Sequence, residues 1–284
     1  MSKRPEELFS LQGKVAVITG GGGELCGCMA QALGERGVKV AVLDLNPENA
    51  EARAASIGSA GGEAKAFACD VLKEGELAEV SRKVAAAWGP ADILINGAGG
   101  NNPKGSTSVE FLEADQLDDP EARSFLDLEM EGFRSTFDLN FLGTFLPTKV
   151  FCRGMIEKGA GSILNMASMS ALTPLTKVGA YSAAKAAVAN FTRWLSVHLA
   201  HAGVRVNALA PGFFMTEQLR FLHIDQKTGE LTPRAKQVIA HTPLGRYGDP
   251  QDLIGAVIWL LSDAAAFVTG VVLPIDGGFS AYSI

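Results

Sequence analysis

The chain has 284 residues, a net charge of −6 and a hydrophobic fraction of 47%. This length allows a full α/β core, and the composition excludes a disordered or fibrous chain. The acidic balance, without any block of Lys or Arg, argues against a nucleic-acid partner. We find no signal-peptide pattern and no apolar run of membrane-spanning length, so we expect no membrane partner and a cytoplasmic location.

The four cysteines are scattered and do not suggest a disulfide framework. Cys26 and Cys28 could be half of a metal site, but no second Cys or His pair lies near them in the sequence. We therefore expect small buried thiols at a helix start, and no metal.

A β-branched run over 14–19 predicts a buried strand, and Gly20, Gly21, Gly22 and Gly23 follow it directly. A helix-compatible stretch over 24–35 comes next. Strand, glycine loop and helix in this order favour a phosphate-binding turn, since glycines admit a pyrophosphate and the helix N-terminus supplies N–H groups. A plain flexible turn is the alternative.

The next predicted strand, 39–44, ends at Asp44, about 20 residues beyond the glycines. An acid at this spacing fits a hydrogen bond to an adenosine ribose and would repel a 2′-phosphate. No Lys or Arg stands in the glycine loop or directly after Asp44, so the sequence favours NAD over NADP. A solvated acid at a strand end is the alternative.

Asn46 and Pro47 predict the start of a helix that runs to about residue 57. Strands are predicted over 64–70 and 92–96, with a helix over 74–88 between them. Asp70 ends the first of these strands. The second leads into a further glycine turn over 97–100. This alternation predicts parallel strands joined by right-handed crossovers, with ligands at the carboxyl edge.

Residues 101–130 form an irregular insert that we expect to be functional or partly helical. A long helix is predicted over 132–158, and Asn140 lies inside it among apolar residues. There it either faces a site or satisfies a core hydrogen bond. A strand over 161–167 follows and ends at Ser168.

Tyr181 and Lys185 stand four residues apart in a stretch over 178–202 that should be helical. Residues at this spacing share one helix face, so the phenol and the ammonium would point into one space. A nearby cation lowers a phenol's pKa, which suits proton exchange with a carbonyl or alcohol. The alternative is coincidence, because this spacing alone is a weak signal.

The remaining elements are a strand over 204–209, a helix from Asp249 and Pro250 to about residue 261, and a last strand over 271–276. Residues 213–241 show weak periodicity and are predicted to be a mobile cover over the substrate. Residues 1–10 are expected to be an N-terminal extension. We see no repeat and no linker, so 1–284 is predicted to be a single domain.

Together these motifs resemble the short-chain dehydrogenase/reductase family over the chain from about Phe9 onward. The residues that carry the resemblance are Thr19-Gly20 with the glycine loop, Asp70-Val71, Asn96-Gly-Ala-Gly99, Asn140, Ser168, Tyr181-x-x-x-Lys185, Asn207, Pro211-Gly212, Pro243-Leu-Gly-Arg246 and Asp276-Gly-Gly278. The resemblance implies a Rossmann fold with a doubly wound, seven-stranded parallel sheet, and a homotetramer. It implies a catalytic set of Asn140, Ser168, Tyr181 and Lys185.

The same resemblance implies the residues that hold NAD. They are Gly20, Gly22, Gly23, Glu24, Leu25, Asp44, Leu45, Asp70, Val71, Asn96, Gly97, Ala98, Gly99, Tyr181, Lys185, Pro211, Gly212, Phe214 and Thr216. Two departures stand out. Glu24 and Cys26 occupy the family's second and third glycine positions, and Gly97 replaces the usual second Asn of Asn-Asn-Ala-Gly. The pyrophosphate turn must therefore differ in detail.

A narrower resemblance, to the D-mannonate oxidoreductase or fructuronate reductase subgroup, rests on Gly99-Gly-Asn-Asn-Pro-Lys104, the insert and the Gly-Gly-Phe-Ser-Ala-Tyr282 tail. It implies an NAD(H)-dependent ketone/alcohol reaction on a small sugar acid. Asn101, Asn102, Lys104, Ser168 and Arg246 are candidate substrate contacts, and Lys104 or Arg246 could meet its carboxylate. The alternatives are another sugar acid, a polyol, a 3-oxoacyl thioester or a non-catalytic nucleotide sensor.

Overall fold

The computed structural model describes residues 4–283. Within them, one parallel sheet has the strand order β3-β2-β1-β4-β5-β6-β7. Its strands are β1 (Val15–Thr19), β2 (Lys39–Asp44), β3 (Glu63–Ala68), β4 (Ile93–Asn96), β5 (Gly161–Met166), β6 (Val204–Pro211) and β7 (Val272–Ile275). The order reverses at β1, because β2 lies on one side of it and β4 on the other. The predicted doubly wound, seven-stranded sheet is confirmed.

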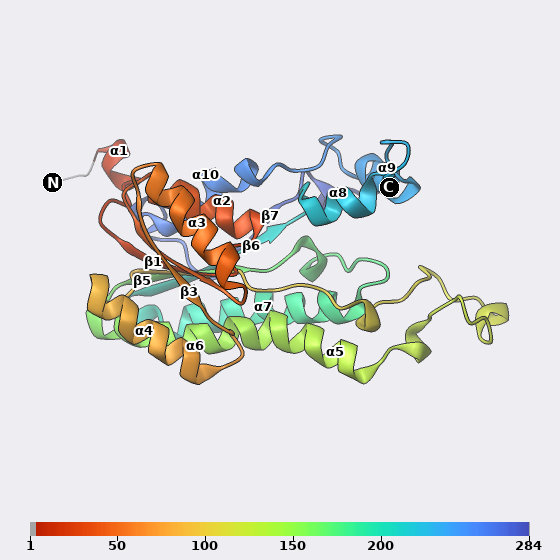
Figure 1. Ribbon diagram of the computed structural model, residues 1–284, viewed down its shortest axis with the longest axis horizontal. Helices are drawn as coiled ribbons and strands as arrows, with labels where there is room; N and C mark the ends of the chain where they lie inside the picture. Colours follow the sequence, from red (N-terminus) through yellow and green to blue (C-terminus); the bar gives the residue numbers. More distant parts are fainter. Residues whose placement is uncertain (1–3, 284) are drawn as a thin grey trace.

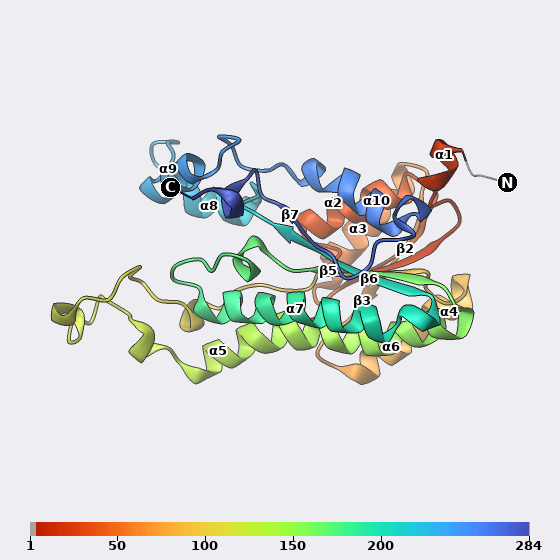
Figure 2. The same ribbon diagram turned by 180° about the vertical axis from the view of Figure 1, so that it is seen from behind.

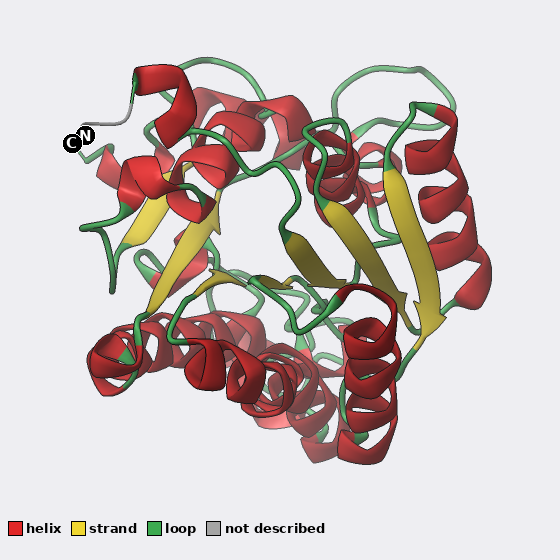
Figure 3. Ribbon diagram, turned by 90° about the vertical axis from the view of Figure 1, so that its left-hand side faces the viewer, coloured by secondary structure: helices red, strands yellow, loops and turns green. Residues whose placement is uncertain are grey.

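Helices cover both faces of this sheet (Figures 1 and 3). One layer contains α2 (Glu24–Gly34), α3 (Pro47–Ser59) and α10 (Ile254–Leu261). The other contains α4 (Glu74–Trp88), α6 (Gly143–Lys158) and α7 (Gly179–His198). The short helix α1 (Pro5–Leu8) lies at the N-terminal end, on the side of the first layer.

Successive side chains of a strand point to opposite faces of the sheet, so a single strand can contribute to both hydrophobic cores. In β1, Ala16 and Ile18 belong to the cluster beneath α2, α3 and α10, whereas Val15 and Val17 belong to the cluster beneath α4, α6 and α7. All of β1 is buried. This double burial explains why the strand is a continuous apolar run in the sequence.

The long helical segment predicted over 132–158 is confirmed, but it is not a regular α-helix throughout. Helix α5 (Met130–Phe137) begins two residues earlier, and a π-helical turn, Asp138–Leu142, separates it from α6. A π turn adds one residue to a helical turn and is frequent at functional sites. Hydrophobic periodicity does not detect a single added residue, so the break could not be seen from the sequence.

The insert over 101–130 has short 3-10 turns at Pro103–Gly105, Ala114–Gln116 and Phe125–Asp127, and it projects beyond the carboxyl edge of the sheet (Figures 1 and 2). At the same end, the predicted cover over 213–241 contains α8 (Glu217–His223) and α9 (Pro233–His241). The hydroxyls of Thr216 and Thr232 cap these helices. The sequence did not predict either helix, because both are short and carry much charge.

Candidate active site

A cavity of about 690 Å³ lies at the carboxyl edge, between the glycine loop, the turn after β4 and the start of α8. It brings together most of the predicted cofactor residues: Gly20, Gly22, Gly23, Glu24, Leu25, Asp44, Leu45, Asp70, Val71, Gly97, Ala98, Gly99 and Thr216. It also contains Asn49 and Leu139, which the sequence analysis missed because neither belongs to a recognisable motif.

The glycine loop is packed so closely that it requires glycine. Gly20 has a φ of +63°, a conformation that favours glycine, and a Cβ at Gly22 would lie 2.6 Å from Asn49 and 2.9 Å from Asp44. The carboxylate of Asp44 accepts hydrogen bonds from the N–H groups of Gly22 and Asn46, both at 3.0 Å. The cavity thus has a backbone-lined wall at a helix start and an acid at its edge, which fits a dinucleotide.

Hydrogen bonds to buried side chains hold the turn after β4 in place. Thr19 Oγ1 accepts hydrogen bonds from the N–H groups of Gly97 at 3.0 Å and Ala98 at 3.2 Å. The side chain of Asn96 is buried and donates to Thr148 and Asn165, both at 2.8 Å. Asn96 thus positions the turn from within the core, and its side chain does not line the cavity.

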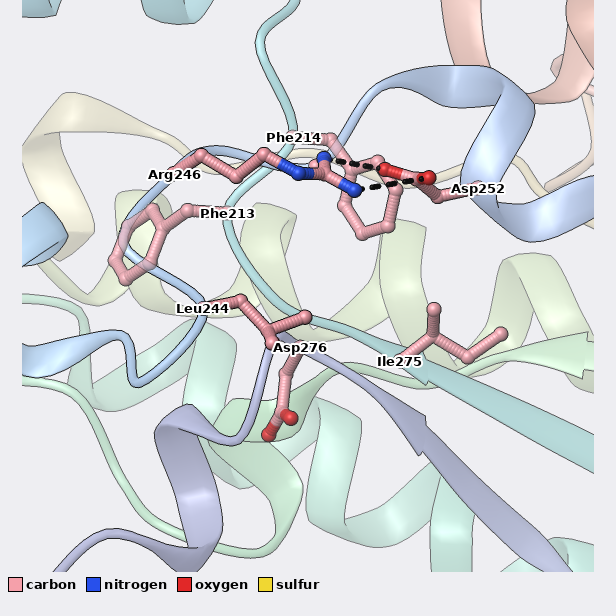
Figure 4. A pocket seen from close by; sticks show the side chains of 9 residues that line it. Phe213, Phe214, Leu244, Arg246, Asp252, Ile275 and Asp276 are labelled. Carbon is pink, nitrogen blue, oxygen red and sulfur yellow. Dashed lines mark hydrogen bonds and ion pairs between the residues drawn. The ribbon is translucent and has the colours of Figure 1, made fainter.

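The last predicted cofactor residues, Pro211, Gly212 and Phe214, lie beside the C-terminal strand. Gly212 donates its N–H to the Ile275 carbonyl, and a Cβ on it would lie 2.7 Å from Asp276. Phe214 is buried and lines a separate, smaller cavity of about 150 Å³ (Figure 4). None of the three lines the large cavity.

Ser168, Tyr181 and Lys185 meet where β5 ends and α7 begins. The side chain of Ser168 hydrogen-bonds the Tyr181 phenol. The ammonium of Lys185 is buried, donates to the Met166 carbonyl at 2.7 Å and lies 5.6 Å from the centroid of the Tyr181 ring. The i, i+4 spacing therefore does bring the phenol ring and the ammonium onto one helix face.

The expected lowering of the Tyr181 pKa is not found. Burial raises the pKa of Tyr181, and the hydrogen bond from Ser168 opposes that rise. Burial also lowers the pKa of Lys185 to about 8, so its charge is itself disfavoured. Desolvation of the phenolate outweighs the hydrogen bond from Ser168, so Tyr181 keeps its proton at neutral pH.

Asn140 is completely buried within the π turn. Its amide donates to the carbonyls of Gly100 at 2.6 Å and Thr136 at 2.7 Å, and its Oδ1 accepts from the Gly100 N–H at 3.3 Å. A Cβ on Gly99 would lie 2.7 Å from that oxygen and 3.3 Å from Lys185 Nζ. Asn140 thus fixes the glycine turn next to Lys185.

The candidate substrate contacts in the insert have partners of their own. Asn101 donates to Ser106 at 2.8 Å, and Asn102 accepts from the N–H of Lys104 at 3.0 Å. Lys104 forms an exposed ion pair with Glu129 at 3.1 Å.

Arg246 forms an ion pair with Asp252 at 2.7 Å, and Figure 4 shows the two side chains turned toward each other above Phe214. A substrate carboxylate at Lys104 or Arg246 would compete with an internal acid.

Arg234, on α9, is a cation that the sequence analysis missed. Its guanidinium lies 2.6 Å from Glu110 of the insert and 3.3 Å from the hydroxyl of Thr176, in the segment that leads to Tyr181. It thus joins the cover segment to the insert and to the wall of the catalytic site. Both partners of Arg234 are more than fifty residues away in the sequence, so no local motif could have indicated its role.

Among residues 4–283, no group of His, Cys, Asp or Glu is arranged to hold a metal ion. None of the helices in that range is both long and apolar enough to cross a bilayer.

A cavity that fits a dinucleotide and a neighbouring cluster of Ser168, Tyr181 and Lys185, at one edge of the same sheet, are features of oxidoreductases that act on alcohols and ketones. A family model described as enoyl-(acyl carrier protein) reductase matches residues 25–280. The chain belongs to the short-chain dehydrogenase/reductase family, and it is an oxidoreductase of alcohol and keto groups whose cofactor is NAD.

Particular relatives cover almost the whole chain. A Haemophilus influenzae structure with bound NAD, provisionally called a D-mannonate oxidoreductase, is 47% identical and has a TM-score of 0.91 over 96% of this chain and 97% of its own. An uncharacterized oxidoreductase of Bacillus subtilis, UxuB, is 46% identical over 96% of this chain and 97% of its own. D-threitol dehydrogenase of Mycolicibacterium smegmatis is 34% identical over 96% and 95%, respectively.

Proposed function

We propose that the protein interconverts a ketone and a secondary alcohol on a sugar acid with NAD(H), and that D-fructuronate and D-mannonate are the preferred pair. The observation that carries the reaction type is the contact of Ser168, Tyr181 and Lys185 beside a cavity that fits a dinucleotide. The 47% identity to a protein provisionally called a D-mannonate oxidoreductase supports the substrate.

NAD, when bound, supplies or takes up the hydride. In the reductive direction Tyr181 gives its proton to the ketone oxygen while Ser168 donates a hydrogen bond to that oxygen. The raised pKa of Tyr181 suits this role, because the phenol keeps its proton at neutral pH. Lys185 would hold the nicotinamide ribose, and Asn140 would hold a water that returns a proton from solvent. Oxidation is the reverse.

A polyol is the second candidate substrate. The 34% identity to a D-threitol dehydrogenase favours it. The ion pairs of Lys104 and Arg246 also favour it, because both cations are already paired with an acid and a substrate carboxylate would have to displace that acid. A 3-oxoacyl thioester fits less well, because such reductases usually prefer NADPH and Asp44 disfavours a 2′-phosphate.

The test is NADH oxidation at about 340 nm, the reduced nicotinamide band, against D-fructuronate, D-tagaturonate, 5-keto-D-gluconate, the ketone erythrulose and acetoacetyl thioesters, each repeated with NADPH. We expect fructuronate with NADH to give the highest kcat/KM. A higher kcat/KM with erythrulose than with any of the acids would show that the substrate is a polyol and not a sugar acid. Absence of turnover on the whole panel, with NADH still bound, would favour a sensor.

We also propose a cytoplasmic homotetramer formed by a single-domain chain. The outer face of α6 and α7 supports self-association, because Phe145, Trp194 and Val197 are 38%, 56% and 77% exposed there. Trp194 stacks on Phe191 and His198, which extends this aromatic row. Light scattering should give four times the chain mass, and Trp194→Glu should lower it. A monomer at micromolar concentration would contradict the proposal.

A further inference from the structure

Glu24 stands where the family usually has a glycine, and the structure gives it a specific contact. It is the first residue of α2, is half-buried and lines the cofactor cavity. Both of its carboxylate oxygens lie 2.9 Å from the backbone N–H of Glu217, the first residue of α8. The contact therefore joins the glycine loop to the cover segment across 193 positions of sequence.

The chemistry of this contact is favourable on both sides. The first N–H groups of α8 have no partner within their own helix, and Thr216 satisfies only that of Leu219. A carboxylate at this place accepts a charge-assisted hydrogen bond and lies at the positive end of the α8 dipole. A glycine at position 24 could make neither interaction.

The position of the contact gives it a consequence for cofactor exchange. Glu24, Thr216 and Glu217 all line the same cavity, which the cover segment therefore helps to enclose. At its other end the cover segment is held by Arg234 to Glu110 and Thr176. If α8 moves away from the cavity, the contact of Glu24 with Glu217 must break.

We propose that Glu24 is a positioning residue that holds the start of the cover segment over the cofactor and thereby slows the release of NADH. The role depends on the dinucleotide and on the cover, and not on which carbonyl compound is reduced. It can therefore fail or hold independently of the proposed substrate.

The test is the NADH dissociation rate, measured by stopped-flow fluorescence after displacement with excess NAD⁺. Loss of one charge-assisted contact should raise this rate in Glu24→Ala about fivefold to thirtyfold. Glu24→Gln keeps one acceptor oxygen and should show a smaller rise. Glu35→Ala is the matched control, since it removes the same charge at the other end of α2, where the side chain bonds only Gln31. Its rate should not change.

A second measurement separates this role from a local effect on α2. Without cofactor, hydrogen exchange of backbone amides at the start of α8 should accelerate in Glu24→Ala and not in Glu35→Ala. If Glu24→Ala does not fold, the same two measurements on Glu24→Gln decide. An unchanged dissociation rate in a folded Glu24 variant, or faster exchange confined to α2, would overturn the proposal.

Discussion

The thiol of Cys26 occupies the space that any side chain at position 97 would need. A Cβ built on Gly97 would collide with Cys26 Sγ and would lie 2.8 Å from the carbonyl oxygen of Thr19. Two of the departures from the family pattern, the cysteine in the first turn of α2 and the glycine after β4, therefore compete for one space.

This competition predicts that the two positions are energetically coupled. Gly97→Asn alone overfills the site and should lower the free energy of unfolding by about 1–3 kcal/mol. Adding Cys26→Gly should recover much of the loss, with a coupling of about 0.5–3 kcal/mol in urea denaturation. Gly75→Asn is the control, because a Cβ there meets nothing within 4 Å. Strictly additive effects would contradict a shared space.

Tyr181→Phe removes the proposed proton donor and keeps the ring. We expect kcat to fall about 10²- to 10⁴-fold, the usual contribution of a general acid. NADH affinity, measured by fluorescence titration, should stay within about threefold of the wild type, because the lost hydroxyl has Ser168 as its partner. Tyr282→Phe, in the exposed tail, should leave kcat unaltered. Substantial turnover in Tyr181→Phe would remove this residue from the mechanism.

Charge reversal should reveal the role of the Glu110–Arg234 pair. The two side chains are only 26% and 33% exposed, so the pair is more strongly coupled than a surface pair. Arg234→Glu should raise KM for the carbonyl substrate about fivefold with a smaller effect on kcat. The double variant Arg234→Glu with Glu110→Arg should bring KM most of the way back to the wild-type value. Arg153→Glu breaks an exposed pair in α6 and serves as the control. An equal KM in wild type and Arg234→Glu would be the contrary result.

Asp44→Ala should weaken the preference for NADH over NADPH. The variant should lose the proposed hydrogen bond to the adenosine ribose, worth about tenfold in KM for NADH, and should no longer repel a 2′-phosphate. It also loses the bonds to Gly22 and Asn46, so its thermal unfolding should be measured in parallel. An unchanged ratio of kcat/KM between the two cofactors would show that Asp44 does not face the ribose.

Lys185 should make stability depend on pH above neutrality. Burial lowers the pKa of Lys185 from 10.5 to about 8, so between these values the unfolded chain binds more protons at this site than the folded one. Its contribution to stability therefore rises as pH increases through this window, by at most about 3 kcal/mol. Cys26, with a pKa raised to about 12, acts oppositely above about pH 9.

The difference between wild type and Lys185→Met measures this contribution together with the smaller coupling between Lys185 and Cys26. The variant should be more stable relative to wild type at pH 7.5 than at pH 10.5, as measured by urea denaturation. A constant difference across the window would mean that the ammonium is not desolvated.

The sheet and most of its helices could be predicted because their signals are local. The predicted bounds of β2 and α4 agree with the structure, and Asn46 caps α3 as expected, accepting from Glu48 at 2.8 Å. In these segments, alternation, capping residues and glycine turns all indicate the same structure.

Several of the missed features of the site depend on contacts between distant segments. The partner of Glu24 lies 193 residues away, and that of Arg234 lies 124 residues away. The raised pKa of Tyr181 likewise comes from burial, which the spacing to Lys185 does not report. Motifs place such residues at one sheet edge, but packing decides which groups pair there.

The π turn between α5 and α6 has a consequence for how the insert is aimed. One residue of an α-helix corresponds to a rotation of about 100°. The π turn takes up its extra residue within one widened turn, so α5 keeps the orientation relative to α6 that a regular helix would give it. Without that widening, one extra residue would rotate α5, and the insert that precedes it, by about this angle. The direction in which the insert projects therefore depends on the π turn, which lies in the helix after the insert.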